Sequence, residues 1–171
     1  MNAPKYAREE IERRWLVDLA AVGPLAQFPC REIDDRYLTG TRLRLRCMRD
    51  GAQAVHKLCK KYGKAPGGSE PITNLYLTQA EYETLAQLPA LAVRKHRYAI
   101  ADGALDVYLS PEGLAIFEKE FGSQAEAAAY QPPAFVGAEV TDEARYSGAA
   151  LAGAAFPAAV ASKGMRVTTG E

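Results

Sequence analysis

The sequence predicts an α+β protein that is mainly β, built as a closed antiparallel barrel with a few short helices outside it. Three observations support this prediction. Several segments alternate polar and apolar residues with the period of two that strands show. Turn sequences such as Asp50-Gly51 and Asp102-Gly103 separate neighbouring segments, as they do in hairpins. Charged residues also recur on one face of these segments, and a closed barrel with a wet interior would accommodate such a face.

The composition bounds the domain organisation and the partners. The 171 residues suffice for one domain, predicted at 1–153, followed by a small and polar tail at 154–171. Lysine and arginine number 21, and aspartate and glutamate also number 21, so the net charge is zero. A neutral chain does not favour nucleic acid or an anionic membrane as its partner. Any electrostatic function must therefore come from charges that the fold separates.

The cysteines and the apolar runs indicate the compartment. The three cysteines, Cys30, Cys47 and Cys59, are odd in number and lack the spacing of a disulfide framework or a zinc site. They are typical of a protein in a reducing compartment. The sequence also lacks an apolar run of about 18 residues and a recognisable signal peptide. The chain is therefore expected to be cytoplasmic, with no membrane contact.

Residues 10–17 form the segment around which the other predicted strands are arranged. As a strand, they place Glu10, Glu12 and Arg14 on one face. Two acids and a base on one face are poor core material, and they require water, a counter-charge or a metal. Helix propensity and apolar spacing over 6–19 favour a surface helix instead. We prefer the strand because later segments supply matching charges.

A strand predicted at 41–47 carries three arginines on one face, Arg42, Arg44 and Arg46. A half-exposed sheet with solvated arginines is one interpretation of this pattern. Because neighbouring arginines repel one another, an anion-binding face is the other. The segment alone leaves both interpretations open.

The remaining elements follow from turn and capping signals. Thr78 and Glu81 form a capping box that predicts a helix from 78 to about 88, and Ser123 with Glu126 predicts a second helix. The other predicted elements are strands at 32–38, 54–63, 72–77, 92–100, 104–109 and 114–121, and a last short helical region capped by 141–143.

Taken in order, these segments resemble the CYTH domain family, also called the triphosphate tunnel metalloenzymes, over roughly residues 9–151. A single Glu-x-Glu-x-Lys motif would be a weak signal, whereas an ordered series with matching faces is specific. The matching segments are Glu10-Ile11-Glu12-Arg13-Arg14, Arg44-Leu45-Arg46, Lys60 with Gly63, Lys95-His96-Arg97-Tyr98, Leu105-Asp106-Val107-Tyr108, Glu118-Lys119-Glu120-Phe121, and Glu139-Val140-Thr141 with Arg145-Tyr146.

The resemblance implies an eight-stranded, tunnel-shaped barrel that hydrolyses or cyclises triphosphates with Mg²⁺ or Mn²⁺. Hard carboxylate oxygens suit these ions better than zinc, and the implied metal ligands are Glu10, Glu12, Glu118 and Glu120. The expected substrate-binding cations are Arg42, Arg44, Arg46, Lys60, Lys95 and Arg97. The expected catalytic residues are Arg14, Lys95 and Asp106, although Asp106 could instead be a structural partner of an arginine. His56 is a further polar residue that is predicted to face inward, as Arg42 does.

The sequence also departs from the family pattern. Arg14 stands where the family usually has lysine, and Ile72 and Asn74 stand where it commonly has a further acidic pair, with Glu70 the nearest carboxylate. The predicted function is hydrolysis of a small-molecule triphosphate, either inorganic triphosphate or a nucleoside triphosphate. An adenylate cyclase and a non-catalytic polyphosphate-binding module are the alternatives, and the missing acidic pair favours the latter. Such barrels can pair as homodimers, but the sequence specifies no interface.

Overall fold

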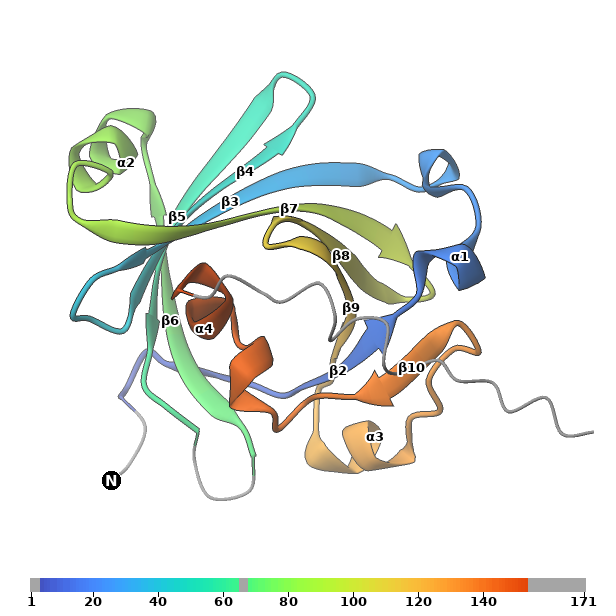
Figure 1. Ribbon diagram of the computed structural model, residues 1–171. Coiled ribbons are helices and arrows are strands. Elements are labelled where there is room, and N and C mark those ends of the chain that lie inside the picture. Colours follow the sequence, from blue (N-terminus) through green and yellow to red (C-terminus); the bar gives the residue numbers. More distant parts are fainter. Residues whose placement is uncertain (1–3, 65–67, 154–171) are drawn as a thin grey trace, which may run out of the picture.

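The computed structural model describes residues 4–64 and 68–153, so the predicted tail at 154–171 lies outside the described residues. Within them, ten strands form one antiparallel sheet with the order β1-β6-β5-β4-β3-β7-β8-β9-β2-β10 (Figure 1). The strands are β1 (Arg8–Glu10), β2 (Glu12–Val17), β3 (Cys30–Leu38), β4 (Leu43–Asp50), β5 (Gln53–Lys61), β6 (Glu70–Leu77), β7 (Ala90–Ile100), β8 (Gly103–Ser110), β9 (Glu112–Glu120) and β10 (Val136–Glu139). The helical elements are α1 (Leu19–Val22), η1 (Leu25–Gln27), α2 (Gln79–Leu85), α3 (Gln124–Ala129), η2 (Ala144–Tyr146) and α4 (Gly148–Gly153). The predicted class, mainly β with a few short helices, is confirmed.

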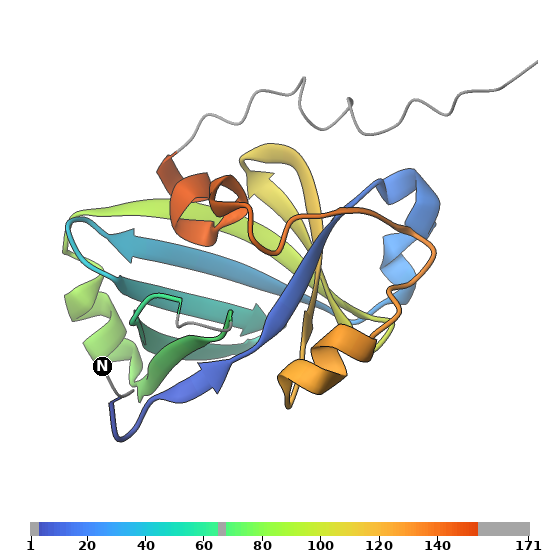
Figure 2. The ribbon, with the colours of Figure 1, turned by 90° about the horizontal axis from the view of Figure 1, so that it is seen from below.

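The first segment of the sheet is extended, so the strand interpretation is confirmed and the surface helix is wrong. The segment is divided at Ile11 into two strands with different partners. β1 pairs with β6, where Glu10 lies opposite Glu70, and β2 pairs with β9. One stretch of chain therefore joins strands that stand far apart in the sheet order, and the sheet curves strongly between them (Figure 2).

The predicted closed ring of eight strands is not confirmed. In the described part of the chain the sheet has ten strands, and its order ends at β1 on one side and at β10 on the other. Two features account for the difference. The division at Ile11 gives two short strands in place of one, and β10 adds a strand beside β2 where the sequence predicts none.

Aromatic side chains on the outer face of β2 and β9 pack beneath the chain that follows α3. Trp15 is 2% exposed, and its ring centroid lies 5.9 Å from that of Phe117 and 5.8 Å from that of Tyr130. The ring of Phe121 also lies 5.1 Å from that of Tyr130. These contacts give Trp15, Phe117 and Phe121 a packing role outside the sheet.

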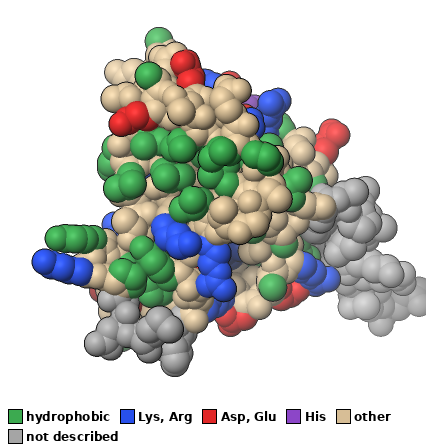
Figure 3. All heavy atoms as spheres, turned by 90° about the vertical axis from the view of Figure 1, so that its left-hand side faces the viewer, with side chains coloured by type: hydrophobic (Ala, Val, Ile, Leu, Met, Phe, Trp, Pro, Cys, Tyr) green, Lys and Arg blue, Asp and Glu red, His purple; other side chains and the backbone are tan. Residues whose placement is uncertain are grey.

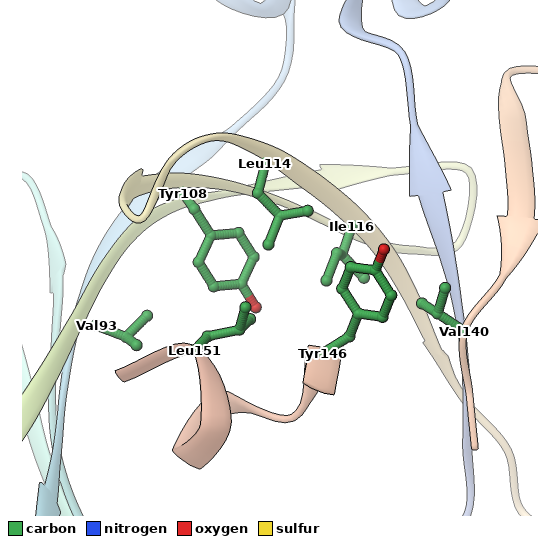
Figure 4. Close-up of a cluster of buried hydrophobic side chains, with 7 residues drawn as sticks. All are labelled: Val93, Tyr108, Leu114, Ile116, Val140, Tyr146 and Leu151. Atoms are coloured by element: carbon green, nitrogen blue, oxygen red, sulfur yellow. The ribbon is translucent and has the colours of Figure 1, made fainter. Parts of the chain in front are cut away.

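A buried apolar cluster lies on the inner side of the curved sheet (Figure 4). Its members are Val93, Tyr108, Leu114, Ile116, Val140, Tyr146 and Leu151. Tyr146 of η2 and Leu151 of α4 belong to the segment that follows β10, and α4 packs against β7 and β3. Gly148 permits this close packing, because a β-carbon at that position would overlap the Tyr37 hydroxyl. The prediction that all helices lie outside the sheet is therefore wrong for α4 (Figure 1).

The predicted capping signals are present at the starts of α2 and α3. Thr78 Oγ1 accepts a hydrogen bond from the Glu81 backbone N–H at 3.3 Å, and the Glu81 carboxylate accepts one from the Thr78 N–H at 2.7 Å. Ser123 Oγ accepts from the Glu126 N–H at 3.2 Å. The third predicted cap is wrong, because η2 begins after Glu143, whose side chain makes no capping hydrogen bond.

Replacing Thr78 with alanine is expected to lower the free energy of unfolding by about 1 kcal/mol, because a backbone N–H in the first turn of α2 loses its acceptor. Urea denaturation followed by circular dichroism measures the change. Thr39 is exposed in the β3–β4 turn and serves as the control, and Thr39→Ala should change this free energy by less than about 0.5 kcal/mol. Equal effects of the two variants would contradict the capping role.

Apolar side chains gather across the face that lies to the left in Figure 1 (Figure 3). Elements on that side carry the exposed residues Leu75 and Tyr76 of β6 and Leu88 and Leu91 around the start of β7. Exposed apolar residues are common on protein surfaces, so this face identifies no partner, and the homodimer stays a prediction. In the described part of the chain, no helix has the length and apolar character needed to cross a membrane.

Candidate active site

The inner face of the sheet surrounds a cavity of about 530 Å³ that is lined mainly by charged side chains. Ser147, Gly148 and Ala149, at the start of α4, form part of its wall, so α4 bounds the cavity on one side. The cavity therefore contains acids and bases from strands that are distant in the sequence. The charged residues that line it are Glu10, Glu12, Arg14, Arg42, Arg44, Arg46, Lys61, Lys64, Glu70, Lys95, Arg97, Glu118, Glu120, Asp142 and Glu143.

Most residues that the sequence assigns to a site line this cavity. Strand alternation is the reason, because Arg44 and Arg46 face inward from β4 while Leu45 and Cys47 are buried on the other face. The arginines of β4 therefore fit the anion-binding interpretation better than the solvated one. The predicted residues that line the cavity are Glu10, Glu12, Arg14, Arg42, Arg44, Arg46, Lys95, Arg97, Glu118 and Glu120.

Lys60 is not among the lining residues, and its neighbour Lys61 is. Lysines on both faces of β5 make the inner face ambiguous from sequence. The pairing resolves it, because Cys59 lies opposite Arg44 and Lys61 shares the face of Cys59. His56, which the sequence predicts to face inward, lies on the outer face, where its ring packs against α2.

Asp106 lies behind the cavity wall and holds two of the cations that line it. Its carboxylate is 0% exposed and contacts the ammonium of Lys95. Arg97 donates to it from Nε and from Nη2, each at 2.6 Å. Burial lowers the pKa of Lys95 in spite of this carboxylate. Of the two roles that the sequence leaves open for Asp106, the geometry supports the structural partner.

Glu118 also forms ion pairs with arginines that line the cavity. One carboxylate oxygen accepts from Arg14 Nε at 3.1 Å and the other from Arg97 Nη2 at 2.6 Å. Burial would raise the pKa of Glu118, but Lys95, Arg97 and Arg14 outweigh it and hold the pKa well below its ordinary value. In this arrangement Glu118 positions the arginines, and its assignment to a metal stays a prediction.

Asp35 is a buried residue of the site that the sequence does not single out. Its carboxylate accepts from Arg46 Nε at 2.6 Å and from Arg46 Nη2 at 2.7 Å. Arg44 Nε lies 3.7 Å from Asp35, and in the described residues this buried nitrogen has no hydrogen-bond partner. A buried guanidinium N–H without an acceptor is a donor available to an anion. The acids of β3 lie on both faces, so alternation alone could not identify Asp35.

At another part of the cavity, Lys61 forms ion pairs with two carboxylates, those of Glu10 and Glu70. Its Nζ donates to Glu70 Oε2 at 2.8 Å and to Glu10 Oε2 at 3.1 Å. Burial would lower the pKa of Lys61, but the two glutamates raise it above its ordinary value. Glu70 is therefore the acid that β6 contributes to the cavity, near the position where the sequence shows Ile72 and Asn74 in place of an acidic pair.

Glu12 and Glu120 form a second acidic pair. They lie opposite each other in the pairing of β2 with β9. Arg14 Nε lies 3.9 Å from Glu12, and in the described chain Glu120 makes no ion pair. Burial, with Glu118 and Glu10 nearby, raises the pKa of Glu12 to about 7. This pair therefore has little compensation from the protein's own cations.

The donors of the second acidic pair fit Mg²⁺ or Mn²⁺. In residues 4–64 and 68–153, no three His, Cys, Asp or Glu side chains are already grouped to hold a metal. The chemistry of Glu12 and Glu120 is nonetheless that of hard oxygen ligands, which these ions prefer. Glu10 is the next carboxylate along the same segment, although Lys61 holds it. Glu12 and Glu120 are thus the residues that best fit the ion.

Comparisons with known proteins agree with this arrangement. No family model matches the chain. The chain is 34% identical over 155 residues to the inorganic triphosphatase of Nitrosomonas europaea, covering 84% of this chain and 96% of that enzyme. The crystal structure of the inorganic triphosphatase NE1496 matches with a TM-score of 0.54 and 28% identity, over 84% of this chain and 93% of that one. The PH1819 protein from Pyrococcus horikoshii shares the fold, with a TM-score of 0.52 and 19% identity over 70% of this chain and 82% of that one. The chain therefore belongs to the family of the Nitrosomonas europaea inorganic triphosphatase.

Proposed function

We propose that the chain is a metal-dependent hydrolase that cleaves a phosphoanhydride bond of inorganic triphosphate bound in the charged cavity. The observation that carries the proposal is the convergence of Arg14, Arg42, Arg44, Arg46, Lys61, Lys64, Lys95 and Arg97 on one cavity. The relationship to a protein named as an inorganic triphosphatase supports the same substrate. A small polyanion is the ligand that such a set of cations fits.

The cations are held in place before the substrate arrives. Asp35 fixes Arg46, Asp106 fixes Lys95 and Arg97, and Glu118 fixes Arg14. A positioned cation stabilises charge that develops on a phosphate without first having to reorganise. Phosphoryl transfer depends mostly on such positioning and electrostatic stabilisation.

Arg42 and Arg44 are more available to phosphate than the fixed cations. Arg44 Nε has no acceptor in the described residues, and Arg42 is exposed and donates to the backbone carbonyl of Tyr62 at 2.7 Å. Gly63 admits the Arg42 guanidinium, because a β-carbon there would lie 2.6 Å from Arg42 Nη1. These two arginines can bind a phosphate without first losing a hydrogen bond to a carboxylate.

We assign Mg²⁺ or Mn²⁺ to Glu12 and Glu120. When bound, such an ion supplies charge neutralisation for the phosphate oxygens and lowers the pKa of a coordinated water. The protein's part is to present the two carboxylates from the neighbouring strands β2 and β9 and to hold the phosphate beside them with Arg14 and Arg97. The same carboxylates suit a small oxygen-preferring ion better than zinc.

We also propose that the curved sheet is the tunnel-shaped barrel of the CYTH family. The support is the first segment, which reaches β6 through β1 and β9 through β2. On this proposal the ring is complete except for the division at Ile11, and β10 is an addition beside β2.

The proposed function is tested by incubating the protein with tripolyphosphate or ATP and Mg²⁺ or Mn²⁺, and measuring released phosphate and cyclic AMP. We expect phosphate release from tripolyphosphate that stops when EDTA is added and returns with excess metal. Cyclic AMP formed from ATP would instead identify a cyclase. Calorimetric binding of tripolyphosphate without either product would identify a binding module and would contradict the proposal.

A further inference from the structure

Lys61 lies between two carboxylates in the cavity. Its Nζ is 2.8 Å from Glu70 and 3.1 Å from Glu10, and these two glutamates are opposite each other in the pairing of β1 with β6. All three side chains are largely shielded from solvent, with 28%, 22% and 18% of their surface exposed for Lys61, Glu70 and Glu10. A single ammonium thus attracts both members of a pair of acids that would otherwise repel each other.

The face of β6 that carries Glu70 offers no further acid. Ile72 lies directly opposite Lys61 in the pairing of β5 with β6, and Asn74 follows on the same face. Ile72 is buried and cannot coordinate an ion, whereas Asn74 is exposed toward the other end of the strand. In the described residues of this strand, Glu70 is therefore the carboxylate that reaches the cavity.

The other strand glutamates that line the cavity fall into two groups. Glu118 is held by Arg14 and Arg97. Glu12 and Glu120 lie opposite each other in the pairing of β2 with β9, and in the described residues their shortest ion-pair contact is the 3.9 Å one between Arg14 and Glu12. The cavity thus contains one glutamate pair that a lysine already bridges, Glu10 with Glu70, and one pair that is left for an external cation, Glu12 with Glu120.

We propose that Lys61 takes the place of a second divalent cation, so that the substrate-free protein holds one metal ion, at Glu12 and Glu120. The inference rests on the proposed function, because that function is what calls for the metal. Nζ sits within hydrogen-bonding distance of both Glu10 and Glu70, in the space that a bridging ion would need. Mg²⁺ loses its waters reluctantly, whereas the ammonium is tethered to β5 and always present.

The test counts bound Mn²⁺ in the substrate-free protein, from the electron paramagnetic resonance signal of the free ion in equilibrium titrations. We expect saturation at about one ion per chain for the wild type and about two for Lys61→Met, in which Glu10 and Glu70 can share an ion. The matched control is Lys60→Met, which removes the same charge from the outer face of β5 and should bind about one ion, as the wild type does.

A wild-type count of two ions, or a count of one for folded Lys61→Met, would overturn the inference. If Lys61→Met does not fold, Glu70→Gln and Glu12→Gln keep it testable. Glu70→Gln should still bind one ion, Glu12→Gln should bind none, and the reverse pattern would overturn the assignment. Phosphate release by the wild type is measured separately. Hydrolysis by a chain that holds two ions would refute this inference alone, and a chain that holds one ion without hydrolysis would refute the proposed function alone.

Discussion

Replacing Asp106 with asparagine is expected to lower the free energy of unfolding by about 3–5 kcal/mol, which is the usual cost of removing one partner from a buried ion pair. The carboxylate is fully buried, and it compensates both Lys95 and Arg97. Asparagine keeps the size of the side chain but presents a neutral amide, so the buried Lys95 and the partly buried Arg97 both lose the carboxylate that compensates them. Among the carboxylates of the described residues, Glu118 is then the one that remains paired with Arg97.

Chemical denaturation of the variant and the wild type measures this effect. Asp102→Asn is the matched control, because Asp102 is also paired, with Lys119, but its side chain is 91% exposed. An exposed pair contributes little, so the control should change the free energy of unfolding by less than about 1 kcal/mol. If Asp106→Asn lowers the free energy of unfolding no more than Asp102→Asn does, the buried ion-pair network does not stabilise the fold.

Replacing Arg44 with methionine is expected to lower kcat/KM for triphosphate hydrolysis by about a hundredfold, or roughly 2.7 kcal/mol of transition-state stabilisation. Arg44 lines the cavity, and its Nε has no acceptor in the described residues, so its guanidinium can serve the bound phosphate. Methionine fills similar space without the charge. The loss should therefore appear in the kinetics more than in the stability.

Steady-state phosphate release from tripolyphosphate gives the kinetic parameters. Arg49 lies on the same strand, β4, but is exposed, and Arg49→Met should stay within about twofold of the wild type. Denaturation of Arg44→Met checks that the protein is folded. A folded Arg44→Met with wild-type kcat/KM would mean that the phosphate binds elsewhere in the cavity.

Alternation predicted much of the site because a strand has two faces and the inner one is charged. It placed Arg44 and Arg46 inward from β4 and Glu12 and Arg14 inward from β2, as the structure does. It failed on β5, where lysines occupy both faces and only the pairing of Cys59 with Arg44 identifies the inner one.

Other parts of the fold left no clear local pattern. Asp35 follows another acid, so its face could not be told from sequence. The division at Ile11 arises because β1 pairs with β6 and β2 pairs with β9. These partners are distant in the sequence, so local patterns could not predict the division. The segment of α4 is rich in alanine, and Leu151 alone gives too little apolar pattern to predict burial inside the sheet.

The position of α4 also constrains the order in which the chain can fold. Tyr146 and Leu151 complete the inner cluster, yet they follow all the described strands in the chain. During synthesis on the ribosome, a nascent chain that has reached only β9 has no side chains to fill the hollow beside Val93 and Ile116. The interior must therefore stay incomplete until η2 and α4 emerge, so final consolidation of the sheet is a late event that depends on contacts distant in sequence.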